Sequence, residues 1–254
     1  MTPYIQASAN TSGGSSGSPV IDMNGYAVAM VAGGYTGAAK DLYLPLDYAL
    51  CALQSFKSGR PMLRGTIQSH WILEQPADCR ARGVSDDVLQ KHGTGYSGLL
   101  VAERVIAKGP SAGKIVEGDI LLTVNDGNIN TLSRLESLID EAVEKQINVR
   151  IARYGTEYVF DLNVQDFFKL TPYRLLEFAG SVFHDVRYGA AFRYNVPIEG
   201  VLLPIAKGSF NLHGEGNKLI CSLNKKPTPD LDAFIGVARE IPRKFDCFSG
   251  TLLY

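Results

Sequence analysis

Apolar residues within positions 1–60 fall into short runs that predict a small β-rich unit followed by a helix. Residues 25–33 (GYAVAMVAG) are nearly all apolar and follow an Asn-Gly pair, which is typical of a strand entered from a tight turn. A second apolar run at 42–46 leads into residues 47–57, and Gly59 and Pro61 end the pattern. We therefore expect a short amphipathic helix over 47–57. Its apolar positions are Tyr48, Leu50, Cys51, Leu53 and Phe56.

A second unit is predicted over residues 61–165. Apolar runs at 96–105 and 116–129 are typical of strands. Between 132 and 143, apolar residues recur every three or four positions, which predicts an amphipathic helix with Ser133 and Glu136 available as a capping box. A strand pair that turns at Tyr154-Gly155 follows the helix.

The third unit, 166–254, repeats the second imperfectly. Residues 125–135 (NDGNINTLSRL) align with residues 224–234 (NKKPTPDLDAF), 99 positions later. Upstream, GLLVAERV in the second unit has a counterpart in GVLLPIAKG at 200–208. A repeat of this size indicates a duplicated domain. The second copy is expected to be incomplete, because nothing after residue 244 matches the closing strand pair of the first.

Composition excludes several function classes. Of the 254 residues, 45% are hydrophobic and 20% charged, and the formal net charge is −1, so nucleic acid and membrane are not expected as partners. No uninterrupted apolar run is long enough for a membrane span, and no leader pattern precedes Thr11. The four cysteines lie far apart, which predicts free thiols and no metal site.

The Gly- and Ser-rich stretch 11–22 (TSGGSSGSPVID) has two possible interpretations. It is either a flexible linker or a tight turn that presents a nucleophilic serine. A serine needs a base to accept its proton and N–H donors for the developing oxyanion. The α/β-hydrolase elbow fits poorly, because Ser18 stands where its last glycine belongs and a strand-like run follows in place of a helix.

A better match is found in the trypsin-like serine peptidases. Residues 14–25 (GSSGSPVIDMNG) resemble their nucleophile loop, hydrophobic strand and Asn-Gly hairpin, with Ser15 where Asn or Asp is commoner. The flanking stretches YIQASANTSGG, GYAVAMVAGG and LYLPLDYALCAL resemble the HtrA family, in which PDZ modules follow the protease. Together with RGTIQ, DCRARG and NKKPTPDLDAFI, they are similar to the fungal HtrA-like proteases with tandem PDZ modules.

This resemblance implies a mainly β fold with α/β elements: a C-terminal part of a trypsin-like β-barrel at 1–60, a PDZ domain at 61–165 and an incomplete PDZ-like domain at 166–254. It implies that Ser16 is the nucleophile of a serine endopeptidase. Gly14 and Ser16 would supply the oxyanion N–H groups, with Ser15 between them in the loop. The family uses no cofactor and no metal.

The same resemblance places the triad His and Asp before the serine, yet only 15 residues precede Ser16 and all four histidines follow it. We therefore expect the isolated chain to be inactive as a protease. Two hypotheses remain open: a segment of an HtrA-type endopeptidase, or a non-catalytic PDZ scaffold that binds peptides.

PDZ modules bind a peptide as an added strand beside a helix and hold its C-terminal carboxylate with loop amides. The resemblance places this loop at YSGLL, so that Ser97, Gly98 and Leu99 would offer backbone groups. The apolar pocket would be lined by Leu100 with Leu135 or Leu138, although these leucines could equally be ordinary core residues.

The second copy is expected to bind C-terminal peptides poorly, because Glu199 would repel an incoming carboxylate. The implied partners are protein substrates and C-terminal peptides, with a homo-oligomer possible. The resemblance also implies a nuclear protein linked to stress and apoptosis.

Overall fold

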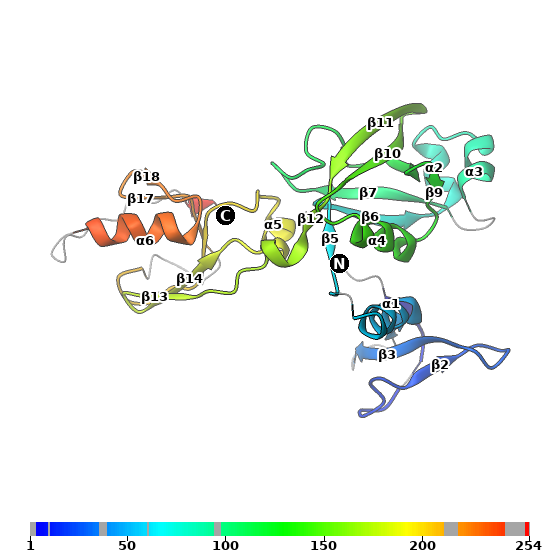
Figure 1. Cartoon of the computed structure of the whole chain (residues 1–254), viewed down its shortest axis with the longest axis horizontal. Coiled ribbons are helices and arrows are strands. Elements are labelled where there is room, and N and C mark those ends of the chain that lie inside the picture. Colours follow the sequence, from blue (N-terminus) through cyan, green and yellow to red (C-terminus); the bar gives the residue numbers. More distant parts are fainter. Residues whose placement is uncertain are drawn as a thin grey trace.

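The chain forms three parts that follow one another along the sequence (Figure 1). The computed structural model describes residues 4–9, 11–35, 40–59, 61–93, 98–210, 218–241 and 252–253. In Figure 1 the first part is blue, the second runs from cyan to green, and the third from yellow to red.

The first part is an open sheet of four antiparallel strands beside one helix. The strands lie in the order β1-β4-β3-β2, and the described residues form no closed barrel. The predicted strand and helix are both present. The elements are β1 (Ile5–Ala7), β2 (Pro19–Ile21), β3 (Ala27–Tyr35), β4 (Lys40–Pro45) and α1 (Leu46–Lys57).

This sheet has a very small core. Its buried cluster consists of Ala29, Val31 and Tyr43, and no described residue of α1 is fully buried. Apolar side chains are instead exposed to solvent, with Met23 103% and Phe56 84% exposed. The helix therefore has the predicted amphipathic pattern, but the contacts of this chain leave much of its apolar side uncovered.

The second part, which the resemblance predicts to be the first PDZ-like module, is built on a six-stranded antiparallel sheet. Strands follow the order β11-β10-β8-β7-β6, and β9 pairs with β8. The strands are β6 (Ser69–Glu74), β7 (Leu99–Val105), β8 (Ile120–Val124), β9 (Gly127–Asn128), β10 (Gln146–Arg153) and β11 (Thr156–Asn163). The helices are α2 (Pro76–Ala81), α3 (Asp86–His92) and α4 (Leu132–Glu141).

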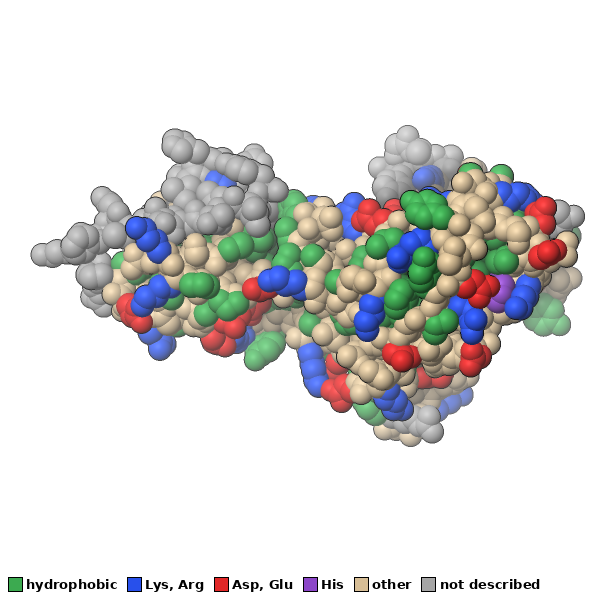
Figure 2. Space-filling view, turned by 90° about the horizontal axis from the view of Figure 1, so that it is seen from above, with side chains coloured by type: hydrophobic (Ala, Val, Ile, Leu, Met, Phe, Trp, Pro, Cys, Tyr) green, Lys and Arg blue, Asp and Glu red, His purple; other side chains and the backbone are tan. Residues whose placement is uncertain are grey.

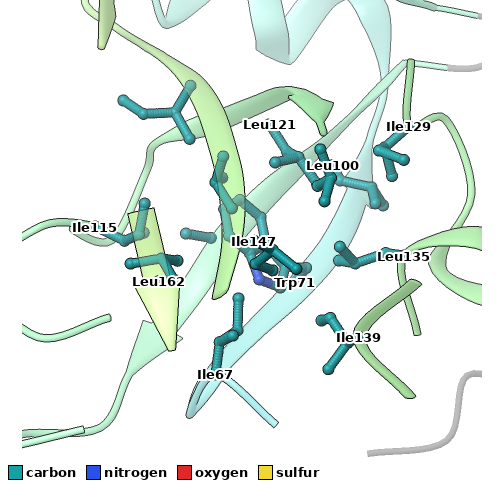
Figure 3. Close-up of a cluster of buried hydrophobic side chains, with 14 of the residues drawn as sticks. Ile67, Trp71, Leu100, Ile115, Leu121, Ile129, Leu135, Ile139, Ile147 and Leu162 are labelled. Carbon is teal, nitrogen blue, oxygen red and sulfur yellow. The ribbon is translucent and has the colours of Figure 1, made fainter. Parts of the chain in front are cut away.

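The core of this module lies between the sheet and α4. Figure 3 shows Trp71, Leu100, Ile147 and Leu135 pointing into one shared space, and all four belong to the same buried cluster. The predicted hairpin turn is confirmed at Tyr154-Gly155, where both residues have positive φ.

Helix α4 begins two residues earlier than the proposed capping box requires. Its N-cap is Thr131, whose side chain accepts a hydrogen bond from the N–H of Arg134 at 3.2 Å. The prediction that Ser133 caps the helix is therefore wrong, because Ser133 already lies in the first turn.

Two short strands tie the two ends of the module together. β5 (Gly65–Thr66) pairs antiparallel with β12 (Gln165–Asp166), and the N–H of Phe167 donates to the carbonyl of Arg64 at 2.7 Å. A 3₁₀ turn at Phe167–Leu170 then leads into the third part.

The third part, the second PDZ-like module, has a five-stranded sheet in the order β13-β14-β15-β16-β19. Strand β19 lies in the C-terminal tail and pairs with β16. The sequence pattern predicted no counterpart of this tail in the first module. The strands are β13 (Leu176–Phe178), β14 (Ser181–Asp185), β15 (Val201–Ile205), β16 (Lys218–Ile220), β17 (Ser222–Leu223), β18 (Lys226–Pro227) and β19 (Leu252–Leu253). The helices are α5 (Tyr188–Tyr194), the 3₁₀ turn Gly208–Phe210 and α6 (Leu231–Glu240).

The predicted repeat is visible in local geometry. Asn125-Asp126 and Asn224-Lys225 both have positive φ in equivalent hairpin turns. Asp230 caps α6 by accepting from the N–H of Ala233, as Thr131 caps α4. The same turn and the same type of cap therefore recur 99 positions apart.

The two PDZ-like modules contact each other through α5, which lies between them in Figure 1. Ile106 of the first module is buried in a cluster with Val186, Ala191 and Leu219 of the second. The guanidinium of Arg104 donates to the carbonyl of Phe192 at 2.6 Å. This mixture of apolar and polar contacts joins the modules directly.

Candidate functional site

The serine-rich loop is held at both ends by the sheet. Asp41 of β4, 5% exposed, accepts hydrogen bonds from both the N–H and the hydroxyl of Thr11, the former at 3.0 Å. At the other end, the N–H of Gly17 donates to the carbonyl of Val31 at 2.8 Å, and Val31 donates back to Ser18 at 2.9 Å. The loop is therefore an anchored turn, and the linker interpretation does not describe it.

Two turns in this loop leave Ser16 exposed. Gly14 and Gly17 have φ of 96° and 85°, the left-handed region that glycine enters without strain. Among the described residues, the N–H groups of Gly14 and Ser16 donate no hydrogen bond, whereas Ser15 and Ser18 both donate within the loop. The predicted pair of oxyanion donors is thus available to a ligand.

No histidine of the described residues serves Ser16. His70 contacts Glu103 at 2.6 Å, His92 contacts Asn128 at 2.8 Å, and His184 contacts the carbonyl of Asp185 at 2.6 Å. His213 lies outside the described residues. The serine turn is present without a base for its hydroxyl among these groups.

The hairpin after the loop is stabilised by Asp22. Its carboxylate accepts from the N–H groups of Tyr26 and Asn24 at 2.9 and 2.8 Å, and these bonds hold the pKa of Asp22 below its ordinary value. The predicted Asn-Gly turn is confirmed at Asn24-Gly25, where Gly25 has a φ of 85°.

The loop expected to bind a peptide carboxylate lies inside the first PDZ-like module. Ser97 lies outside the described residues. Gly98 packs against the backbone of Glu74, and Leu99 and Leu100 are both fully buried. Leu99 and Leu100 belong to different clusters on opposite faces of the sheet.

Strand β7 has no free edge. It pairs with β6 on one side, where Leu100 faces Leu73, and with β8 on the other, where Val101 faces Ile120. A peptide cannot add to a strand whose two edges are already paired. The open edge of this sheet beside α4 is β6, which the sequence pattern did not single out.

Leu135 and Leu138 lie on the α4 face that packs on the sheet. Leu135 is 2% exposed within the core and Leu138 packs against it half-buried. Leu73 of β6 is 45% exposed and lies two positions after the buried Trp71. Residues two apart in a strand share a face, so the Leu73 side chain is on the same sheet face as α4. Leu73 and Leu138 therefore border the space between β6 and the helix.

A polar junction adjoins the start of β6. Arg64 forms ion pairs with Glu136 at 2.8 Å and Asp140 at 3.0 Å, and the N–H of Gly65 donates to Asp140 at 2.7 Å. Burial raises the pKa of Asp140 despite these favourable partners. Burial lowers the pKa of Arg64, but the two carboxylates outweigh it and leave that pKa raised.

In the corresponding region of the second module, the residue expected to repel a peptide carboxylate has a basic partner. Glu199 forms an ion pair with Lys108 of the first module at 2.5 Å, so its charge is neutralised at the contact between modules. Strand β15, which follows it, is paired on both sides like β7.

Neither a metal site nor a membrane span emerges from the part of the chain that the structure describes. Its His, Cys, Asp and Glu side chains form no group of three arranged for a metal ion. Its helices are all too short or too polar to cross a bilayer.

Comparisons with known proteins cover nearly all of this chain. The PDZ-like domain family matches residues 169–244. The pro-apoptotic serine protease NMA111 of Yarrowia lipolytica is 44% identical over 248 residues, which cover 95% of this chain and 25% of that protein. The Saccharomyces cerevisiae protein of the same name is 42% identical over 246 residues, with the same coverage.

Among solved structures, the HtrA-type protease AlgW with a tripeptide matches with a TM-score of 0.42 and 20% identity, over 64% of this chain and 52% of that one. The chain spans about a quarter of the length of the curated relatives it matches. By sequence, the chain therefore belongs to the family of the pro-apoptotic serine proteases NMA111, and it carries a PDZ-like domain.

Proposed function

We propose that this chain supplies the nucleophile turn and the peptide-binding module of an HtrA-type serine endopeptidase. The observation that carries the proposal is the anchored turn around Ser16. Ser16 is exposed, the N–H groups of Gly14 and Ser16 donate no hydrogen bond within the described residues, and the turn is fixed by Asp41 and Val31. Preorganised donors of this kind stabilise the oxyanion of an acyl-transfer intermediate.

The base that activates Ser16 comes, in this proposal, from outside these 254 residues. The described histidines are committed to other partners. The relatives are about four times as long as the part they share with this chain. The protein substrates, the nuclear location and the role in stress and apoptosis belong to this proposal, which the pro-apoptotic name of the relatives supports for apoptosis.

Labelling with a fluorophosphonate tests the role of Ser16. The isolated chain is expected to react at least about a thousandfold more slowly than the full-length protein, because an unactivated serine is a weak nucleophile. Mass spectrometry of the full-length protein should place the label on Ser16, and Ser16→Ala should abolish it.

The control is Ser18→Ala, which removes another exposed hydroxyl of the same loop and should leave labelling unchanged. Rapid, stoichiometric labelling of Ser16 in the isolated chain would contradict the need for an external base. Labelling that survives Ser16→Ala would contradict the assignment of the nucleophile.

Peptide capture is proposed at the open edge of β6, beside α4. A peptide that adds antiparallel to β6 ends beside Ser69, next to the loop 65–68. In this loop Gln68 has a φ of 56°, and among the described residues the N–H of Ile67 donates no hydrogen bond. The loop therefore offers a backbone donor where the carboxylate of the peptide would lie.

Introducing a negative charge beside β6 tests this position. Leu73→Glu should weaken binding of C-terminal peptides about tenfold, because it replaces an apolar contact of the bound peptide with a charged, hydrated group. The matched control is Val159→Glu on β11, the opposite edge of the same sheet, since Val159 is 48% exposed and Leu73 45%. Titration calorimetry with a panel of C-terminal peptides gives the affinities.

Equal weakening by the two variants would rule out β6 as the specific site. The non-catalytic scaffold is the second candidate function, and it is favoured because no histidine of the described residues contacts Ser16. Peptide binding without labelling of the full-length protein would establish the scaffold in place of the protease.

A further inference from the structure

The second PDZ-like module has one more strand at its helix-side edge than the first. In sheet order, β6-β7-β8-β10 of the first module corresponds to β14-β15-β16-β19 of the second. Among the described residues, this edge of the first module ends at β6, whereas in the second module β13 continues the sheet beyond β14. The edge equivalent to the open one is therefore already paired.

Strand β13 has the direction and position of an added peptide. It runs antiparallel to β14, with Leu176 facing Phe183 and Phe178 facing Ser181. Its C-terminal end reaches the start of β14 through the turn Ala179-Gly180, where both residues have positive φ. A peptide bound antiparallel to β14 would end at the same place.

The side chains of this segment are held by the groove. Leu176 packs on the cluster that contains Phe234 of α6, and the Phe178 ring lies edge-on to Phe210 at 5.8 Å. Arg174, just before the strand, donates two hydrogen bonds of 2.9 Å to Asp232 in the first turn of α6. Apolar and ionic contacts therefore hold the segment on both the sheet and the helix.

We propose that the second module is a peptide-binding module occupied in cis by residues 174–178, Arg-Leu-Leu-Glu-Phe. Its groove selects an extended segment with a basic residue two positions before an apolar one and an aromatic residue two positions after it. This inference stands apart from the proposed function, because it needs neither Ser16 nor the groove of the first module.

A tethered strand competes strongly with a free peptide. A short tether holds a ligand at an effective concentration in the millimolar range or above. An external peptide with a dissociation constant of about 10 μM for the empty groove would therefore bind about 100-fold more weakly while β13 is in place. The module is closed to peptides until β13 is released.

The test uses a fluorescent peptide with the sequence of residues 171–178, TPYRLLEF, and the whole chain. Leu176→Asp should release β13, because it places a carboxylate against an apolar cluster. Fluorescence anisotropy should then show binding about 100-fold tighter than to the unmodified chain. Leu175→Asp is the matched control, since Leu175 is 73% exposed and should leave the groove closed.

Hydrogen exchange provides a second measure of β13 release, with a variant that changes no core side chain. Arg174→Ala removes the exposed ion pair with Asp232 and a contact over the ring of the neighbouring Tyr173, and it leaves the core side chains in place. It should speed amide exchange in 176–178 about tenfold while β15 stays protected. Equal peptide affinity of the unmodified chain and Leu176→Asp would overturn the proposal. So would a folded Leu176→Asp chain that does not bind the peptide, or unchanged exchange in Arg174→Ala.

Discussion

Gly98 lies where two strands approach so closely that a methyl group has no room. A Cβ at this position would be 1.5 Å from the carbonyl oxygen of Glu74, which belongs to the β6 backbone and cannot rotate away. A family resemblance suggested a carboxylate-binding role for this glycine. The contact gives it a structural role at the junction of β6 and β7.

Gly98→Ala should therefore lower the free energy of unfolding by about 3 kcal/mol, because the strands must separate to admit the side chain. Urea denaturation of the whole chain measures the change. Gly236→Ala in α6 is the control: nothing lies within 4 Å of its Cβ position, so stability should be unchanged or slightly higher. A Gly98→Ala chain as stable as the original would contradict the role assigned here.

At the scale of residues, the sequence pattern predicted the turn around Ser16 but did not predict the distant side chains that hold it in place. The Gly-rich turn around Ser16 is recognisable because Gly14 and Gly17 adopt positive φ angles that other residues avoid. Asp41 and Arg64, which hold the serine loop and the start of β6, lie 30 and 72 positions from Thr11 and Glu136. Their importance depends on tertiary contacts that no local pattern reports.

At the scale of elements, α1 and α5 both reach the polar junction around Arg64. The guanidinium of Arg64 lies over the Tyr48 ring of α1 at 5.8 Å, and Tyr188 of α5 lies beside Thr66. Burial raises the pKa of Tyr48, and the nearby Glu136 carboxylate raises it further. Burial also raises the pKa of Tyr188, against the opposing effect of its hydrogen bond with Thr66.

These shifts predict a loss of stability at high pH. Above the ordinary tyrosine pKa of 10.0, the unfolded chain loses phenol protons that the folded chain retains. The unfolded state then binds fewer protons, so the free energy of unfolding falls as pH rises, by at most about 1.4 kcal/mol per pH unit for each group.

Urea denaturation at a series of alkaline pH values measures this slope, which Tyr48→Phe and Tyr188→Phe should each flatten. Tyr154→Phe is the control, because Tyr154 is 90% exposed and its ring is in water in both states. An unchanged slope in both buried-site variants would show that neither ring is desolvated as described.

The elements that sequence predicted best are those with a strong period. Helix α4 and the turn at Tyr154-Gly155 follow from apolar spacing and turn residues. Strand β13 escaped prediction because its three residues, Leu176 to Phe178, are too few to show alternation. Its position depends on pairing with the edge of β14, and this pairing becomes visible only once the sheet is formed.

At the scale of the whole molecule, charged and apolar side chains are distributed differently over the surface. Figure 2 shows acidic and basic side chains interspersed over the visible face, in keeping with a net charge of −1. The first part, by contrast, exposes Met23 and Phe56 around a core of three buried residues. Sequence predicted an incomplete barrel here, and the open four-stranded sheet agrees with it.

The pairing of β5 with β12 brings the entry and exit of the first PDZ-like module side by side. The chain enters at Gly65–Thr66 and leaves at Gln165–Asp166, and the two points are neighbours in one ladder. A pulling force applied to the flanking parts is therefore borne first by this short ladder and by the bond between Arg64 and Phe167. Tension enters the sheet through the two ends of the module only after these have parted, and the contact of Arg104 with Phe192 must also break before the second module pulls free.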